Sequence, residues 1–263
     1  MSLPTEVGDV MSSFDQTPDE PEPFGYKINW LALKTADPAA VLDAIEAEER
    51  TPANWASGVA AAYGDRDSRN SDPWIFVSPP VGGWVFAVSA SLPYPVTIES
   101  EDDSGAKFDA LFSRLMERFD DVQFFGSYRV SDFVTWARAV KGQPVRIFTY
   151  ADGEVLANFG GQTAEEAKLG FANLTGLSPS DAMDKICAIA EEQEVEESRL
   201  VASGLSEADA RARVRQNTRD PWPDEADVGD LAGLWSIDPT QFLDQDHTVG
   251  LGWVARLPKS FAQ

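Results

Sequence analysis

Two short apolar runs, each carrying tryptophan and phenylalanine, lie within residues 71–89, SDPWIFVSPPVGGWVFAVS. Both runs are rich in β-branched and aromatic residues, which favour strands. The proline pair and the glycine pair between them break regular structure and supply a turn. We therefore predict a β-hairpin in which one set of alternating aromatic side chains faces the core: Trp74, Phe76, Trp84 and Phe86. The alternative is that residues 79–83 form an exposed recognition tip.

Helical patterns with start signals lie on both sides of this hairpin. Asp37-Pro38 combines an N-cap acid with a proline in the first turn, and Thr51-Pro52 repeats this arrangement for a second helix. Apolar residues at helical spacing predict a helix over 104–119. The segment 131–142 is predicted to be a short helix that ends at its glycine.

Strand patterns surround these helices. Alternation predicts strands within 26–35, 122–130 and 248–257. A further hairpin is expected over 144–160, because Asp152-Gly153 is the two-residue signal for a type I′ turn. The predicted strands and helices do not alternate regularly as βαβ units. The expected fold class is therefore α+β, with a mainly antiparallel sheet and helices packed on one face.

Three parts of the chain differ in composition. Residues 1–23 hold six acids, no base and several prolines, which predicts a flexible acidic arm. Residues 24–263 are long enough for a single α+β domain with a sizeable core. Within that domain, 178–228 carries two helical patterns and is interpreted as a helical insertion. Thr163 and Glu166, with capping-box spacing, predict a helix before it.

The net charge limits the partners of this chain. Its 263 residues include 44 acids and 21 bases, which leaves a net charge of −23. A field of this sign repels phosphate backbones, so we expect no nucleic-acid binding. It favours a basic protein partner. The alternative is a general acidity unrelated to any partner, as in a salt-adapted proteome.

Side chains that commonly carry catalysis or bind metals are few. His247 is the only histidine, next to Asp246, and we predict a solvated loop residue because a metal site needs three or four converging ligands. Cys187 is the only cysteine and is predicted to be a buried, inert thiol. Gly160-Gly161 lacks the lysine and the spacing of a phosphate-binding loop. We therefore expect no catalytic residue, no metal and no cofactor.

Targeting signals are also missing from the sequence. No apolar run reaches the length of about 18 residues that marks a membrane-spanning helix. The first residues lack the basic start and apolar stretch of a secretory signal. These observations predict a cytoplasmic protein without membrane contact.

Four motifs, taken together, carry a family resemblance: WIFVSPPVGGWVFAVS, VQFFGSYRVSDFVTWARAVKGQPVRIFTYADGEVLANFG, QTAEEAKLGF and LAGLWSIDPTQF. They resemble uncharacterised bacterial cytoplasmic proteins, some of the immunity type that neutralises toxins. The resemblance covers 72–176 and 229–254, and the segment 178–228 departs from it. It implies a protein that binds a toxin, and it offers no functional residues to carry over.

Acidity, few chemical motifs and this resemblance favour a non-enzymatic acidic binding protein, an immunity protein that holds a toxin such as a basic nuclease by complementary charge. The candidate partner-binding residues form two acidic clusters, the second around a tryptophan: Glu191, Glu192, Glu194, Glu196 and Glu197, then Asp220, Trp222, Asp224, Glu225, Asp227 and Asp230. Two alternatives remain open, a carboxylate-dependent hydrolase and a regulatory module with a small-molecule pocket.

Overall fold

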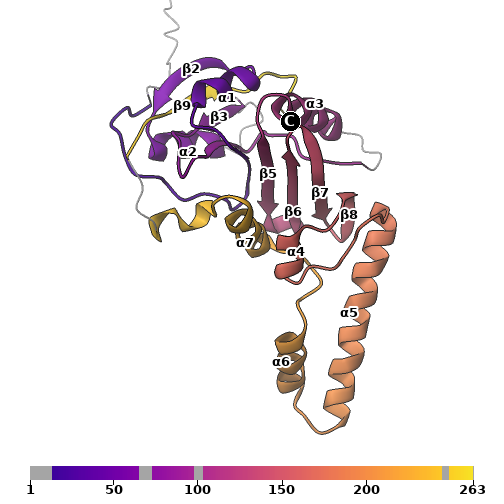
Figure 1. The fold of residues 1–263 in the computed structure, drawn as a ribbon. Helices are drawn as coiled ribbons and strands as arrows, with labels where there is room; N and C mark the ends of the chain where they lie inside the picture. Colours follow the sequence, from indigo (N-terminus) through magenta and orange to yellow (C-terminus); the bar gives the residue numbers. More distant parts are fainter. Residues whose placement is uncertain (1–13, 65–72, 98–102, 245–248, 263) are drawn as a thin grey trace, which may run out of the picture.

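The computed structural model of this chain describes residues 14–64, 73–97, 103–244 and 249–262, with the backbone alone at 243–244. In this part of the chain nine strands form one antiparallel sheet, in the order β2-β9-β3-β4-β1-β5-β6-β7-β8 (Figure 1). The strands are β1 (Ile28–Leu33), β2 (Glu48–Ala53), β3 (Trp74–Val77), β4 (Val85–Ser89), β5 (Asp121–Tyr128), β6 (Phe133–Val140), β7 (Gln143–Ala151), β8 (Glu154–Gly160) and β9 (Gly252–Arg256). The expected α+β class with an antiparallel sheet is confirmed.

Seven α-helices accompany the sheet within the described ranges. They are α1 (Pro38–Ala44), α2 (Trp55–Tyr63), α3 (Ser104–Met116), α4 (Ala164–Lys168), α5 (Pro179–Ala202), α6 (Glu207–Asn217) and α7 (Glu225–Trp235). The described chain also contains two 3-10 segments, Arg129–Ser131 between β5 and β6 and Pro239–Asp244 after α7. None of the described helices combines the length and the apolar character needed to cross a membrane.

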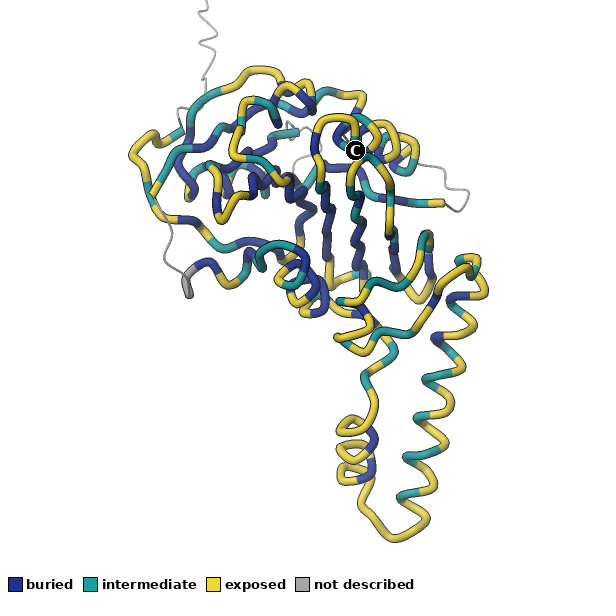
Figure 2. Tube along the Cα trace, viewed as in Figure 1, coloured by how far each residue is buried: buried dark blue, intermediate teal, exposed yellow. Residues whose placement is uncertain are grey.

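Helices cover both faces of the sheet, which differs from the expected packing on one face. Every residue of the central strand β1 is buried, and alternate side chains enter two separate cores. Trp30 packs in the core shared with α2, α7 and the base of α5, whereas Leu31 packs in the core shared with α1 and α3. A strand that is apolar on both faces needs a covering layer on each. Figure 2 shows the resulting buried strands at the centre.

The hairpin predicted within 71–89 is present as β3 and β4. Phe76, Phe86 and Trp84 are buried in the core beside α2 and α7. The turn between the strands closes through reciprocal backbone hydrogen bonds between Val81 and Trp84, of 2.8 and 2.9 Å. The interpretation of these aromatic residues as core is therefore confirmed, although Trp74 is only partly buried.

The segment predicted as a helix over 131–142 is instead the strand β6, and that prediction is wrong. Its central position between β5 and β7 satisfies its backbone on both edges. Alternate residues serve the two cores, with Trp136 on one side and Ala137 on the other. The helix prediction failed because a strand buried on both faces has no polar side to reveal its period of two.

The predicted helix start at Thr51-Pro52 is also wrong. Both residues belong to β2, which pairs with β9 at the edge of the sheet, where a proline is tolerated. The helix α2 begins at Trp55, and the Asn54 side chain caps it by accepting from the amide of Ser57 at 3.0 Å. The Asp37 cap of α1 is confirmed, because its carboxylate accepts from Ala39 and Ala40.

Residues 14–23, the described part of the predicted acidic arm, are docked on the domain. Phe14 packs edge-on against Trp74, with ring centroids 6.0 Å apart. The Asp19 carboxylate accepts from the amides of Trp55 and Ala56, at 2.6 and 3.0 Å, at the start of α2. The prediction of a flexible arm over 1–23 is therefore wrong for residues 14–23. Residues 1–13 lie outside the described residues.

The segment 178–228 leaves the sheet as a pair of helices. α5 contacts β8 at its base and then runs away from the sheet, and α6 returns beside it (Figure 1). The two helices are called the α5–α6 hairpin below. Figure 2 shows that most of this hairpin is exposed, in contrast to the strands. The helical character expected for this segment is confirmed.

Candidate functional site

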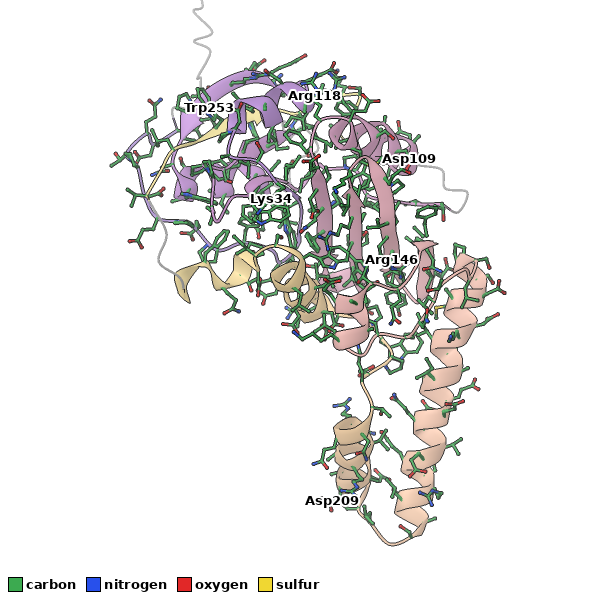
Figure 3. The ribbon with its side chains drawn as sticks, in the orientation of Figure 1. Lys34, Asp109, Arg118, Arg146, Asp209 and Trp253 are labelled. Atoms are coloured by element: carbon green, nitrogen blue, oxygen red, sulfur yellow. The ribbon has the colours of Figure 1, made fainter. Side chains whose placement is uncertain are left out.

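The α5–α6 hairpin begins and turns at residues suited to those positions. Ser178 caps α5 by accepting from the amide of Asp181 at 3.1 Å, and Pro179 occupies the first turn. At the tip, Gly204 adopts a φ of +107°, which favours glycine and ends the helix. Ser206 then caps α6 by accepting from the amide of Asp209 at 3.2 Å. Figure 3 marks Asp209 at this far end of the molecule.

The hairpin has a narrow apolar seam. Ala182 and Ile186 are buried near the sheet, and only Ala210 and Val214 are buried on α6. Halfway along, the Gln193 side chain donates to the carbonyl oxygen of Arg219 at 2.8 Å. Because so little apolar surface is buried between the two helices, the polar contacts along the seam help to keep them together.

Apolar side chains remain exposed on the hairpin. The side chain of Val195 is 69% exposed, and Val201 and Leu205 are also exposed. Glu194 and Glu196 flank Val195 along α5, and Glu194 and Glu197 line the same groove as Val201. An apolar centre with a polar rim is typical of a protein-binding surface.

The first predicted cluster, 191–197, divides into paired and unpaired acids. Glu196 forms an ion pair with Arg199 at 2.7 Å, and Glu197 lies 3.6 Å from Arg211. The hydrogen bond from Arg199 lowers the pKa of Glu196. The remaining acids have no ion pair with any residue that the structure describes, and all are exposed: Glu191, Glu192 and Glu194.

The second predicted cluster, 220–230, has a different role in two of its members. Asp224 caps α7 by accepting from the amides of Ala226 and Asp227, and Asp227 accepts in return from the amide of Asp224 at 2.8 Å. Asp227 is buried and forms an ion pair with Arg219. Burial raises the pKa of Asp227, against the opposing effect of Arg219. The assignment of Asp227 to the binding surface is therefore corrected, because its carboxylate faces inward.

The other acids of this cluster lie nearer the surface. Asp220 is exposed and 3.9 Å from Arg215, and Glu225 is 3.7 Å from Arg129. Asp230 is exposed on α7. Such surface pairs contribute little to stability, so these acids stay available to a partner.

Trp222 lies between Asp220 and Asp224 along the chain and contacts Tyr150 of the sheet. Its side chain is 37% exposed, and its ring centroid lies 6.1 Å from that of Tyr150 on β7. Burial raises the pKa of the Tyr150 hydroxyl. The indole thus contacts the sheet and is still partly exposed, as a residue that anchors an interface would be.

Two grooves of about 840 Å³ each run between α5 and α6. One of them, called the Trp222 groove, brings together acids from both predicted clusters with the tryptophan and an exposed valine: Glu194, Glu197, Asp220, Trp222 and Val201. Arg211 and Arg215 of α6 line its other wall. The second groove is lined by Glu192 and Glu196 opposite Arg213. The sequence did not predict that the two acidic clusters meet in one groove, because they are far apart along the chain and meet only where α6 returns beside α5.

A buried ionic network lies between the sheet and α4, near Arg146 in Figure 3. The Glu166 carboxylate accepts from Arg146 Nε at 2.7 Å, from Trp136 Nε1 at 2.9 Å and from the amide of Thr163 at 2.7 Å. Arg146 also donates to Asn158 at 2.7 Å. The capping box predicted from Thr163 and Glu166 is confirmed. Because the carboxylate is enclosed and fully partnered, its role is structural.

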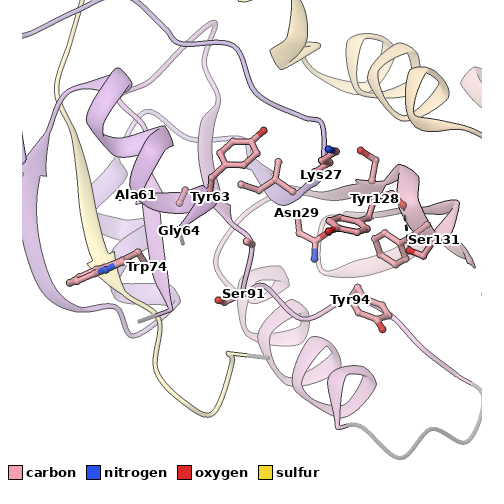
Figure 4. Close-up of a pocket in the computed structure, with 15 residues that line it drawn as sticks. Lys27, Asn29, Ala61, Tyr63, Gly64, Trp74, Ser91, Tyr94, Tyr128 and Ser131 are labelled. Atoms are coloured by element: carbon pink, nitrogen blue, oxygen red, sulfur yellow. Dashed lines mark hydrogen bonds between the residues drawn. The ribbon is translucent and has the colours of Figure 1, made fainter. Parts of the chain in front are cut away.

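A separate pocket of about 410 Å³ opens where β1, β4, β5 and β6 end beside the C-terminus of α2 (Figure 4). It is lined by aromatic rings, small hydroxyl side chains and one lysine. Six of its lining residues are Lys27, Asn29, Tyr63, Ser91, Tyr94 and Tyr128. No sequence pattern indicated this pocket, because its walls come from several segments far apart along the chain.

Two chemical candidates remain, Cys187 and His247. Cys187 is partly buried rather than fully buried as predicted. His247 lies outside the described residues. Within the described ranges, no group of histidine, cysteine and acidic side chains is arranged to hold a metal ion.

Comparisons with protein-family models, with curated proteins and with solved structures found no match for this chain.

Proposed function

We propose that this protein is a non-enzymatic binding protein of the toxin-immunity type, which captures a basic partner protein on its α5–α6 hairpin. The observation that supports the proposal is the Trp222 groove. There, Glu194 and Glu197 of one predicted cluster lie beside Asp220 and Trp222 of the other. The two acidic clusters predicted from the sequence thus both contribute to one groove.

The chemistry of this surface suits a basic protein. An aromatic side chain in a groove provides the apolar centre that carries most of the binding energy at protein interfaces. The surrounding carboxylates steer a basic partner and speed its association. Glu191, Glu192 and Glu194 are exposed and lack ion pairs to the described residues. A partner can therefore bind them without first breaking an internal contact.

The position of the hairpin adds to the argument. It extends beyond the sheet, where a partner meets few other surfaces (Figure 1). Its exposed valine, Val195, lies next to Glu194 along α5. Apolar exposure on a narrow helical arm costs stability in the isolated protein, and a bound partner would remove that surface from water.

Growth protection provides a direct test. The polypeptide encoded next to this gene is produced in a bacterial host, with and without this protein. We expect it to arrest growth alone and to be neutralised by co-expression through a 1:1 complex. If the neighbouring product is harmless, or if it still arrests growth and forms no complex, the proposal is wrong.

Binding kinetics then test the surface itself. The triple variant E191Q/E192Q/E194Q should slow association with the toxin about tenfold at low salt, with a smaller effect at high salt because exposed charges are screened. Trp222→Ala should mainly speed dissociation. The matched control is E20Q/E22Q/E117Q, which removes three exposed acids away from the hairpin. Equal effects of the two triple variants would remove the hairpin from the interface.

A further inference from the structure

The pocket at the strand ends differs from the rest of the molecule in charge and in lining. Among its described lining residues, Lys27 is the only charged one, in a chain whose net charge is −23. Three tyrosines line it together with Phe133 and Trp74. Its volume of about 410 Å³ lies within the range of small-molecule sites, roughly 300–1,000 Å³.

The backbone that leads to Lys27 is fixed by its neighbours, and Lys27 itself is exposed. Lys27 adopts a φ of +57°, a backbone conformation that is rare for residues other than glycine and that is often found at functional sites. Two side chains fix the turn just before it. The Tyr63 hydroxyl donates to the carbonyl oxygen of Tyr26 at 2.8 Å, and Ser127 Oγ donates to the carbonyl oxygen of Gly25 at 3.0 Å.

The walls of the pocket are also ordered by internal contacts. Asn29 is buried and donates to the carbonyl oxygen of Leu92 at 2.9 Å. The rings of Tyr94 and Phe133 pack edge to face, with centroids 4.8 Å apart. Figure 4 shows Tyr63 and Trp74 on the α2 side of the pocket, with Asn29, Tyr128 and Ser131 across from them. A pocket whose walls are fixed beforehand loses little entropy when a ligand binds.

We infer that this pocket binds a small aromatic carboxylate, with its ring among the tyrosines and its carboxylate at the Lys27 ammonium group. Aromatic walls favour a planar ring in offset or edge-on contact. Among the described lining residues, Lys27 is a cation without an acidic neighbour, which favours one negative charge over a neutral or basic group. Ser91 and Ser131 offer hydroxyl groups for the polar substituents of such a ring.

A matched set of probes tests this inference on the full chain. The probes are 4-hydroxyphenylacetate, its neutral analogue 4-hydroxyphenylacetamide, and acetate, titrated by calorimetry and by ligand-observed NMR. At 0.15 M salt the Debye length is about 8 Å, so the field of the distant acids is screened while the contact with Lys27 persists. We expect saturable binding of the phenylacetate, at least tenfold weaker binding of the amide, and no binding of acetate.

Variants locate the site. Lys27→Gln should weaken binding of 4-hydroxyphenylacetate about tenfold, because one charge-assisted hydrogen bond is removed. Ser91→Phe should abolish it by filling the pocket. Lys259→Gln, which removes an exposed lysine away from the pocket, is the matched control and should change nothing. Thermal unfolding confirms that each variant is folded.

Three results would overturn the inference. The first is no saturable binding of 4-hydroxyphenylacetate to the folded protein. The second is equal affinity for the acid and its amide, which would remove the role of Lys27. The third is binding that survives both Lys27→Gln and Ser91→Phe, which would place the ligand elsewhere. Toxin neutralisation is measured separately and does not depend on any of these outcomes.

Discussion

Individual residues in this protein show that the same side chain type can serve opposite purposes. Glu166 is a buried acceptor with three donors, whereas Glu191 and Glu194 lie exposed and unpaired within the described chain. The difference is set by the neighbours that the fold supplies, since all three are glutamates in acidic helical segments. We therefore expect the stability of the fold to depend on Glu166, and partner binding to depend on Glu191 and Glu194.

The buried pair of Arg146 and Glu166 gives a prediction at this scale. Glu166→Gln leaves Arg146, a residue only 3% exposed, without its counter-charge. We expect a loss of about 3–5 kcal/mol in the free energy of unfolding, because an uncompensated buried charge is costly. Urea unfolding followed by circular dichroism measures it. The control is Glu165→Gln on the neighbouring residue, which should stay within about 0.5 kcal/mol, and an equally small loss for Glu166→Gln would show that the network is dispensable.

At the scale of elements, the α5–α6 hairpin and the sheet are nearly independent. The hairpin touches β8 only at its base, and its outer half buries little. The sheet, in contrast, continues through nine strands with a core on each face. Removing the outer hairpin should therefore leave the domain folded.

Excision of the hairpin tests this independence. Residues 194–217 are replaced by a short Gly-Ser linker, which can join the ends because Gln193 contacts Arg219. We expect the melting temperature to stay within a few degrees, since the excised helices bury little and each 1 kcal/mol shifts the midpoint by only about 2–4 °C in a domain of this size. Binding of the toxin should disappear. Differential scanning calorimetry reports the first effect, and loss of cooperative unfolding would show that the hairpin supports the core.

Viewed as a whole molecule, the domain extends further toward the N-terminus than composition suggests. Asp19 accepts from the first two amides of α2 although it lies more than thirty residues away along the chain, and Gly250 beside β9 donates its amide to the carbonyl oxygen of Asp19 at 3.0 Å. Phe14 adds an aromatic contact to Trp74. Residues 14–23 thus join a helix and a strand that belong to distant parts of the chain.

Two truncations separate the docked residues from those before them. A chain that starts at residue 14 keeps the hydrogen bonds of Asp19 to the start of α2 and the packing of Phe14 on Trp74, and one that starts at residue 24 has neither. An N-cap contributes about 1 kcal/mol and an aromatic pair about the same again. We expect the shorter chain to melt roughly 5 °C below the longer one, as differential scanning fluorimetry can measure. Equal melting temperatures would mean that the docking of residues 14–23 contributes nothing.

Local sequence signals determined those features that depend on neighbours along the chain. The Asp37 cap, the Thr163–Glu166 capping box and the turn at Asp152-Gly153 all follow from a few adjacent residues, and the structure contains each of them. Charge predicted two acidic clusters, and helical spacing predicted α5 and α6. In these cases the energy that selects the structure is local.

Tertiary structure decided what the local pattern could not. Within 131–142, residues 133–140 form a strand because β5 and β7 satisfy its backbone on both edges. Helices cover both faces of the sheet because β1 buries apolar side chains on each side. The Asp227 carboxylate points inward because Arg219 forms an ion pair with it and the amide of Asp224 donates a hydrogen bond to it. The Trp222 groove and the pocket at the strand ends form only when segments far apart along the chain meet. The residues that line these two sites follow no common spacing along the chain, so no sequence pattern could predict that they are neighbours.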